Sequence, residues 1–357
     1  MRVLILSPYP TPPGILRSLA TMGVEPVVAE PSSSPAETGP AQSVRVATRG
    51  DAGNPIDLRW SRRALRSAVR DVGPDLLHIV GDPWSPTAEA GAAAARQLTI
   101  PYVLVGMSSV GKPRALASRW QADRVRDGAA ALAGGVRPAL EHLVDGAIAA
   151  VPTAVIPPGG LQIPAPWDPR PDPGPVVFAV VGRLVPERGV DLIVDALNVH
   201  HGDWRLRVVG TGPVHEALEE QAQRLGLSSR IEWLGAVPRD DLSQIWATTD
   251  VLLAPSRSTA EWVEPSGRTV LQAMAHAVAP VVSRCGALPD VVADGGLIVE
   301  ENDVPALARA IQSFLAEPWR CRAVGAAARQ RILEQYTDSA VADRMVQFWR
   351  RAITARS

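Results

Sequence analysis

Lysine is almost missing from this sequence of 357 residues. Of the 36 lysines and arginines, only Lys112 is a lysine. Chemistry that proceeds through a Schiff base or a nucleophilic lysine would therefore have to use Lys112. That residue stands in a stretch typical of a loop before a helix. The composition thus argues against catalysis with pyridoxal phosphate.

Cysteine, long apolar runs and an excess of charge are scarce as well. The two cysteines, Cys285 and Cys321, suit a reducing cytoplasm, and neither they nor the six scattered histidines follow a metal-ligand spacing. The first apolar run is too short for a signal-peptide core, and no run approaches the length of a membrane span. The formal net charge of -1 gives no indication of nucleic-acid binding. We expect a cytoplasmic protein without a metal site or a nucleic-acid partner.

What the sequence does contain is an alternation of short apolar runs with helical stretches rich in Ala and Arg. Continuous apolar strands separated by helices indicate parallel sheets covered on both faces. The expected strands are 3–6, 27–29, 76–80, 102–105, 129–132 and 147–150, followed by 176–181, 205–209, 231–234, 251–253, 281–282 and 297–299. The predicted fold class is α/β, with two doubly wound, Rossmann-like domains.

A proline-rich segment, 157–175, separates the two alternations. Proline at this density prevents a regular helix or a central strand. We therefore predict an N-terminal domain at 1–165 and a C-terminal domain at 166–357, which closes with helices. A second segment, 31–54, is rich in Ser, Pro and Gly and predicts a surface loop. Ligands of such folds bind beyond the carboxyl ends of the strands, so we expect the site in a cleft between the domains.

The stretch from Glu264 to Ala275 is the most informative part of the chain. A carboxylate is followed by Gly267, which allows close backbone approach, and then by the amides of Arg268 and Thr269 at a helix start, where anions bind. Gln272 lies about one and a half turns further and can reach back towards the same ligand. The segment is either a cradle for phosphate and hydroxyl groups or a capped core helix.

Two further loops carry groups suited to a diphosphate. Arg183 and Arg188 follow the first strand of the second half, and arginine forks bind phosphate oxygens bidentately. The turn Gly210-Thr211-Gly212 follows the next strand, and its glycines permit backbone approach to a ligand. Exposed loop arginines and a simple turn are the alternative interpretations.

Together with 231–237 and the Pro255-Ser256 turn, these segments resemble, in the same order, the retaining glycosyltransferases of GT-B architecture (family-4-like, glycosyl transferases group 1). The signature of that family is Glu-x7-Glu, and its second Glu is Gln272 here. The family usually has a Lys where Arg188 stands. The resemblance covers about 176–299 and implies the GT-B fold with its interdomain cleft.

The resemblance also implies an activity. The donor would be a UDP-, GDP- or dTDP-sugar, and the acceptor a hydroxyl of a small molecule, lipid or glycan. The anomeric configuration would be retained, without a metal or other cofactor. Glu264 would then contact the donor sugar, Arg183 and Arg188 would offset the charge of the leaving diphosphate, and Gln272 would face the ribose. Leu234 and Val237 would border the nucleobase.

In the first half of the chain the resemblance is thinner. Gly14 occupies the position of the family's first glycine-rich loop, where its amide would face the donor phosphates, and a proline-rich turn is an equal interpretation. Asp82 and Ser108 are candidates for the acceptor side, although Asp82 could instead cap a helix.

Two other functions stay open at this point. A nucleotide-sugar-binding subunit without catalysis would fit the replacement of the second Glu, and a GT-B sugar-nucleotide epimerase is the other alternative. The basic stretch 112–126 could lie on an anionic membrane surface, or it could be a solvated helix face.

Overall fold

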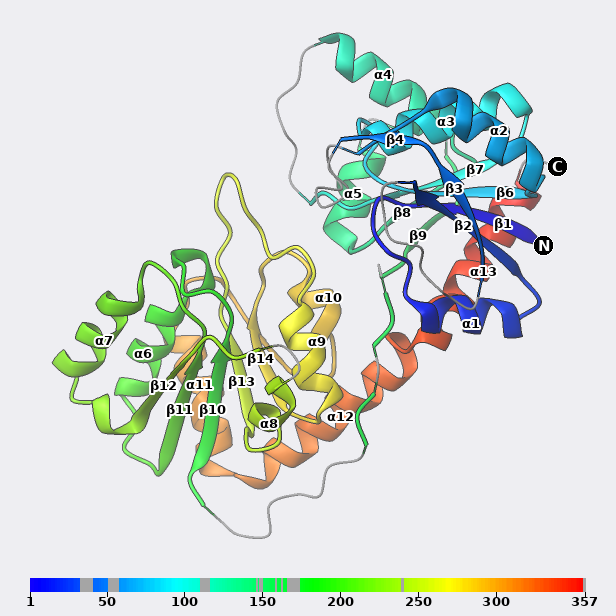
Figure 1. Cartoon of the computed structure of the whole chain (residues 1–357). Helices are drawn as coiled ribbons and strands as arrows, with labels where there is room; N and C mark the ends of the chain where they lie inside the picture. The colour runs from blue at the N-terminus through cyan, green and yellow to red at the C-terminus, as the bar shows by residue number, and fades with distance from the viewer. Residues whose placement is uncertain are drawn as a thin grey trace. The chain divides into compact units, whose positions relative to one another are not determined.

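The structure is a computed structural model, and it describes residues 1–32, 41–50, 58–109, 116–145, 147, 150–157, 159–161, 163–165, 174–238 and 241–355. The chain divides into two compact units (Figure 1). The N-terminal unit comprises Met1–Gly160 together with Tyr336–Ser357, and the C-terminal unit comprises Leu161–Gln335. Each unit has its own parallel sheet with helices on both faces, as the alternation of apolar runs predicts.

The sheet of the N-terminal unit has the order β3-β2-β1-β6-β7-β8-β9, and its neighbouring strands pair in parallel. Its strands are β1 (Arg2–Leu6), β2 (Glu25–Pro31), β3 (Gln42–Val46), β6 (Leu76–Val80), β7 (Tyr102–Gly106), β8 (Ala131–Gly134) and β9 (Thr153–Val155). Its helices are α1 (Pro13–Thr21), α2 (Arg62–Val72), α3 (Pro86–Leu98), α4 (Leu116–Asp127), α5 (Arg137–Val144) and α13 (Asp338–Thr354). Two short strands, β4 (Thr48–Arg49) and β5 (Arg59–Trp60), pair antiparallel beside it.

Side chains of the central strand β1 alternate between two cores. Leu4 and Leu6 pack in a cluster with buried residues of α2 and α3, whereas Val3 and Ile5 pack with those of α1 and α13. Successive strand residues point to opposite faces, so a continuous apolar strand needs helices on both sides. The second face is completed by α13, which comes from the far end of the chain and lies beside α1 (Figure 1).

The sheet of the C-terminal unit has the order β12-β11-β10-β13-β14-β15 and is also parallel. Its strands are β10 (Val176–Val181), β11 (Trp204–Val209), β12 (Ile231–Gly235), β13 (Val251–Ala254), β14 (Ala279–Ser283) and β15 (Leu297–Val299). Its helices are α6 (Val190–Asn198), α7 (His215–Arg224), α8 (Leu242–Trp246), α9 (Arg268–Ala275), α10 (Leu288–Val292), α11 (Val304–Ala316) and α12 (Trp319–Gln335), with 3-10 turns η1 (Pro186–Arg188) and η2 (Ser228–Arg230).

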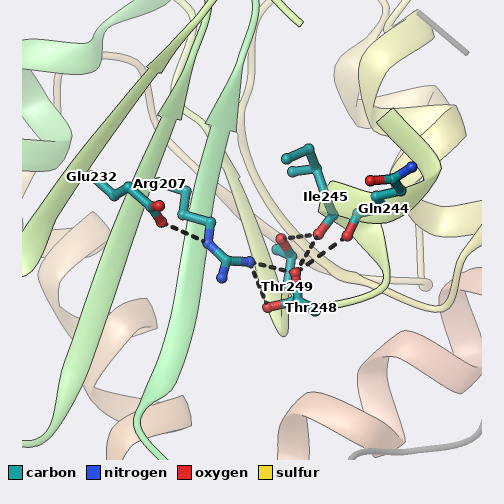
Figure 2. A network of polar contacts seen from close by, with 6 residues as sticks. All are labelled: Arg207, Glu232, Gln244, Ile245, Thr248 and Thr249. Carbon is teal, nitrogen blue, oxygen red and sulfur yellow. Dashed lines mark hydrogen bonds and ion pairs between the residues drawn. The ribbon is translucent and has the colours of Figure 1, made fainter. Parts of the chain in front are cut away.

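A network of hydrogen bonds links neighbouring strands of this second sheet (Figure 2). Arg207 on β11 donates from Nε to Glu232 on β12, at 3.1 Å, and from Nη1 to the carbonyl of Thr248, also at 3.1 Å. Thr248 precedes β13, so the guanidinium links two strands to the start of a third. This arginine is held by acceptors of its own chain.

The structure differs from the sequence-based expectations at three places. The last helix, α13, belongs to the N-terminal unit and not to a C-terminal domain at 166–357, because its apolar face packs against α1 and β1. The expected loop at 31–54 contains β3, which pairs with β2 in the sheet. The strand expected at 147–150 is replaced by β9, which pairs with β8; of those four residues Ala147 and Ala150 are described, and neither is in a strand.

Candidate functional site

The order of strands creates a crevice in the C-terminal unit. The chain runs from β10 outward to β11 and β12, and then returns to β13 on the other side of β10. Loops on the two sides of such a switch point diverge, which leaves a crevice at the carboxyl ends of the strands. A cavity of about 120 Å³ lies there, lined by the ends of β10 and β13, by Arg183 and Arg188, and by the segment Glu264–Val270.

Glu264 is the buried acid of this cavity, with only 3% of its surface exposed. Its Oε2 forms an ion pair with Arg188, and its Oε1 accepts a hydrogen bond from the amide of Gly267 at 3.1 Å. A buried carboxylate needs such partners, because an unpaired charge in the interior is very costly. Part of the anion-binding capacity expected for the Gly267 turn is therefore used by the chain's own carboxylate.

Arg183 and Arg188 both reach the cavity, as expected, but they differ in their surroundings. Arg183 is exposed, whereas the side chain of Arg188 is only 26% exposed and its guanidinium lies 5.4 Å from the centre of the Trp262 ring. The Nε of Arg188 is buried and has no hydrogen-bond partner among the residues that the structure describes. Trp262 was not foreseen from the sequence; its position two residues before Glu264 was the available signal.

Helix α9 begins directly at the cavity. Gly267 adopts the left-handed conformation, with φ of 59°, and Arg268 and Thr269 follow as the first helical residues lining the cavity. No side chain in the described part of the chain caps this helix start, so its first amides remain available to a ligand. Gln272 is half-buried and is not among the lining residues. It lies one turn beyond Arg268 and Thr269 on the same helix face.

The glycine turn lies beside the cavity and does not line it. Gly210 approaches the carbonyl of Gly182 so closely that any side chain there would collide with it, and Gly212 lies equally close to Leu184. The amide of Leu184 donates to the carbonyl of Thr211 at 2.9 Å. The turn therefore supports the backbone on either side of Arg183.

Leu234 and Val237 lie at and just beyond the end of β12, where both side chains are half-buried. They are not among the residues that line the cavity. The carbonyl of Gly235 accepts a hydrogen bond from Gly210 at 2.6 Å. This places the segment next to the glycine turn, further along the same edge of the sheet.

In the N-terminal unit, Asp82 and Ser108 come together at the ends of β6 and β7. Asp82 Oδ1 accepts hydrogen bonds from the amides of Met107 and Ser108, at 2.9 and 3.0 Å, and Oδ2 accepts one from the Ser108 hydroxyl. Helix α3 is instead capped by Ser85, so the capping alternative for Asp82 is wrong. The carboxylate holds two strand ends together.

Gly14 lies near the start of α1, where a side chain would collide with the carboxylate of Asp338 on α13. Burial raises the pKa of Asp338, and the charge of Arg17 acts in the opposite direction. A larger residue here would therefore require the Asp338 carboxylate to move. Its expected role towards donor phosphates stays a prediction.

Neither a metal-binding cluster nor a membrane-spanning helix occurs in the part of the chain that the structure describes. No group of three His, Cys, Asp or Glu side chains gathers in a metal-binding arrangement there. No helix in the same part has both the length and the apolar character to cross a membrane. Lys112 and its neighbours at 110–115, the first part of the basic stretch, lie outside the described residues.

Comparison with protein families gives one match. Residues 165–331 match the model described as "Glycosyl transferases group 1". This segment contains the whole cavity and both flanking loops.

Among curated proteins, a GDP-mannose-dependent alpha-(1-6)-phosphatidylinositol monomannoside mannosyltransferase of Mycolicibacterium smegmatis is 34% identical over 167 residues, which are 45% of this chain and 44% of the relative. The alpha-maltose-1-phosphate synthase of the same organism is 31% identical over 189 residues, 49% of this chain and 48% of the relative. The chain thus spans about half the length of the curated relatives it matches.

Solved structures match over the full length of the chain. Sucrose-phosphate synthase from Thermosynechococcus elongatus has a TM-score of 0.66 at 20% identity and covers 99% of both chains. Anabaena HepE in complex with UDP has a TM-score of 0.70 at 17% identity and covers 98% of this chain and 99% of that one. At these identities the likeness shows the fold, which is GT-B.

Proposed function

We propose that this chain transfers a sugar from a nucleoside diphosphate sugar to an acceptor hydroxyl. The proposal starts from the match of residues 165–331 to the glycosyl transferases group 1 model and from the GT-B fold. The observation that carries this proposal is the cavity at the switch point of the C-terminal unit. A buried carboxylate, two arginines and an uncapped helix start share that one cavity.

The donor diphosphate is proposed to lie against Arg183, Arg188 and the first amides of α9. These groups are donors that are already positioned, and negative charge grows on the leaving phosphate as the bond to the sugar stretches. Charge-assisted hydrogen bonds of this kind are about twice as strong as neutral ones. Fixed cations can offset the diphosphate in place of a metal ion, so the proposed reaction needs no metal.

Glu264 is proposed to accept hydrogen bonds from hydroxyls of the donor sugar. Without donor, its charge is balanced by Arg188. When the diphosphate takes up part of the Arg188 donors, one carboxylate oxygen becomes available at the reacting face. Gln272, one turn along α9, is proposed to face the ribose, with a single acceptor oxygen where a Glu would offer two.

A pocket that buries a drug-sized ligand usually has 300–1,000 Å³, so a cavity of about 120 Å³ can hold only part of a nucleotide sugar. We propose that the sugar and its phosphate occupy the cavity, and that the nucleoside extends along the Gly210 turn towards Leu234 and Val237. The names of relatives include a GDP-mannose-dependent enzyme and a structure with UDP. UDP-, GDP- and dTDP-sugars are therefore the donors to test.

In the proposed step, the bond from the anomeric carbon to the phosphate oxygen breaks and a bond from that carbon to the acceptor oxygen forms. The proton of the acceptor hydroxyl passes to the departing phosphate, on the same face, so the configuration is retained. Asp82 and Ser108 are proposed to orient an acceptor on the N-terminal unit.

The test is incubation of the chain with a panel of UDP-, GDP- and dTDP-sugars in EDTA. We expect slow release of sugar from one donor, with water as the acceptor, and the α-anomer as the first product seen by NMR from an α-linked donor. A β-anomer would contradict retention. Binding of donors without any release would indicate a binding subunit, and a changed sugar on an intact nucleotide would indicate an epimerase.

A further inference from the structure

Ser256 lies in the wall of the same cavity, and its hydroxyl is the feature that the proposed function leaves unexplained. The residue is 1% exposed, and Oγ has no hydrogen-bond partner among the described residues. A buried hydroxyl without a partner costs free energy, so such groups are rare in native proteins and need an explanation. A ligand that enters the cavity would supply the missing partner.

The backbone around Ser256 is held in place from two sides. On one side, the amide of Arg257 donates to the carbonyl of Glu187 at 2.8 Å, and Gly189 packs so closely on the carbonyl of Pro255 that no side chain fits there. On the other side, the Ser283 hydroxyl donates to the Ser256 carbonyl. Ser256 thus lines the cavity from a fixed backbone, next to the turn that carries Arg188.

The neighbouring groups determine which ligand atom fits. Arg188 Nε is buried, also lacks a partner in the described chain, and can only donate. Arg183 adds a second cation to the same cavity. Donors that face one space favour an anionic oxygen as acceptor. Glu264, proposed to contact the sugar, lines the same cavity, so the phosphate concerned is the one bonded to the sugar.

We propose that the Ser256 hydroxyl donates a hydrogen bond to the β-phosphate of the nucleotide sugar and is a donor-binding residue. This inference rests on the proposed function. Ser258, two residues further, provides a contrast within the same loop: its hydroxyl donates to Glu301 at 2.6 Å and is therefore satisfied without a ligand.

The experiment is a calorimetric titration of wild type, Ser256→Ala and Ser258→Ala with UDP and GDP, and with UMP and GMP. For Ser256→Ala we expect the Kd of the diphosphate to rise about tenfold, as for the loss of a hydrogen bond to a charged group. The Kd of the monophosphate should change less than about twofold, because it lacks the β-phosphate. Ser258→Ala should bind both as wild type does.

A second variant, Ser256→Cys, keeps a weak donor at the same place and should give an intermediate loss. Equal losses for mono- and diphosphate, or no loss in Ser256→Ala, would overturn the inference; the latter outcome would mark a serine that binds only water. If wild type binds neither UDP nor GDP, nor dTDP in the same titration, the proposed function fails instead, so the two failures are distinguishable.

Discussion

The two units share one architecture, but particular buried polar groups near their strand ends are satisfied differently. In the N-terminal unit, His78 on β6 accepts a hydrogen bond from Trp349 of α13 at 3.0 Å, and Asp82 accepts the amides at the end of β7. In the C-terminal unit, Ser256 and Arg188 present buried polar atoms that have no partner in the described chain. The former groups are paired within their own unit, whereas the latter are proposed to bind a ligand.

The contrast also exists within the C-terminal unit. Arg207 and Arg188 are about equally buried, with 24% and 26% of their side chains exposed. Arg207 donates to Glu232 and to Thr248 from two of its nitrogens (Figure 2), whereas Arg188 keeps a buried Nε without an acceptor in the described chain. The two arginines are thus alike in burial and differ in whether their buried nitrogens have acceptors.

The largest effect is expected for Glu264→Gln. The amide keeps the shape and an acceptor for the Gly267 amide but removes the charge at the proposed reacting face. We expect the rate of transfer at saturating donor to fall about 10²- to 10³-fold, the usual cost of losing one electrostatic contact to the transition state. Glu232→Gln, which removes a surface carboxylate beside Arg207, should leave the rate unchanged. A rate within threefold of wild type for Glu264→Gln would contradict the proposed contact of Glu264 with the donor sugar.

The pH dependence of stability tests the structural side of the comparison. Burial lowers the pKa of His78 from 6.5 to about 4, so between these values the unfolded chain binds a proton that the folded chain does not. Stability from this group is therefore fully present above about pH 6.5 and falls as the pH approaches 4, by about 3 kcal/mol.

Urea unfolding of wild type and His78→Gln at pH 7 and near pH 4 would measure the contribution of His78 to the free energy of unfolding. The difference between the two proteins should shrink or reverse in acid, because only wild type loses the contribution of a neutral histidine. A constant difference would mean that the proton does not enter at His78.

Replacing Arg188 and Arg207 in turn tests whether the first binds the nucleotide while the second only stabilises the fold. Arg188→Ala should raise the Kd of the nucleoside diphosphate about 10- to 100-fold, since it removes a charge-assisted contact. Arg207→Ala should lower Tm by a few degrees, for a loss of about 1 kcal/mol, and leave the Kd unchanged. Titration calorimetry measures the Kd of each variant, and thermal unfolding measures its Tm. Weakened nucleotide binding in Arg207→Ala would contradict a purely structural role for Arg207.

The smallest effect is expected at Gln272. Gln272→Glu restores a charged acceptor with two oxygens for the ribose hydroxyls, so donor affinity should increase about tenfold. The same titration measures it, with Gln244→Glu on α8 as a control for added charge. An unchanged or weakened affinity would exclude the proposed place of Gln272 at the ribose.

The fold was largely predictable because its strands are continuous apolar runs between helices, as in β10 and β14. Where prediction was wrong, the deciding contact was distant or the strand was irregular. Helix α13 joins the N-terminal unit through contacts with α1, which lies more than 300 residues earlier in the chain. In β3, exposed residues such as Arg45 interrupt the apolar pattern that marks the other strands.

In the site, too, prediction succeeded for local patterns and failed where distant contacts decide. That Glu264, Arg183 and Arg188 line one cavity was predictable, because each follows a strand whose carboxyl end faces the switch point; their roles stay predictions. The missing partner of the Ser256 hydroxyl in the described chain was not predictable, because whether a hydroxyl is satisfied depends on every element packed around it. The packing of Gly14 against Asp338 likewise joins residues from opposite ends of the chain.

The central claim is that the C-terminal unit binds a nucleoside diphosphate through its own unpaired donors. Titration of the whole chain with UDP, GDP and dTDP in EDTA, for wild type and Arg188→Ala, tests it most directly. We predict that wild type binds one of the three without added metal and that Arg188→Ala binds it at least tenfold more weakly. Binding that requires a divalent cation, or that is unaffected by the loss of Arg188, would contradict the account.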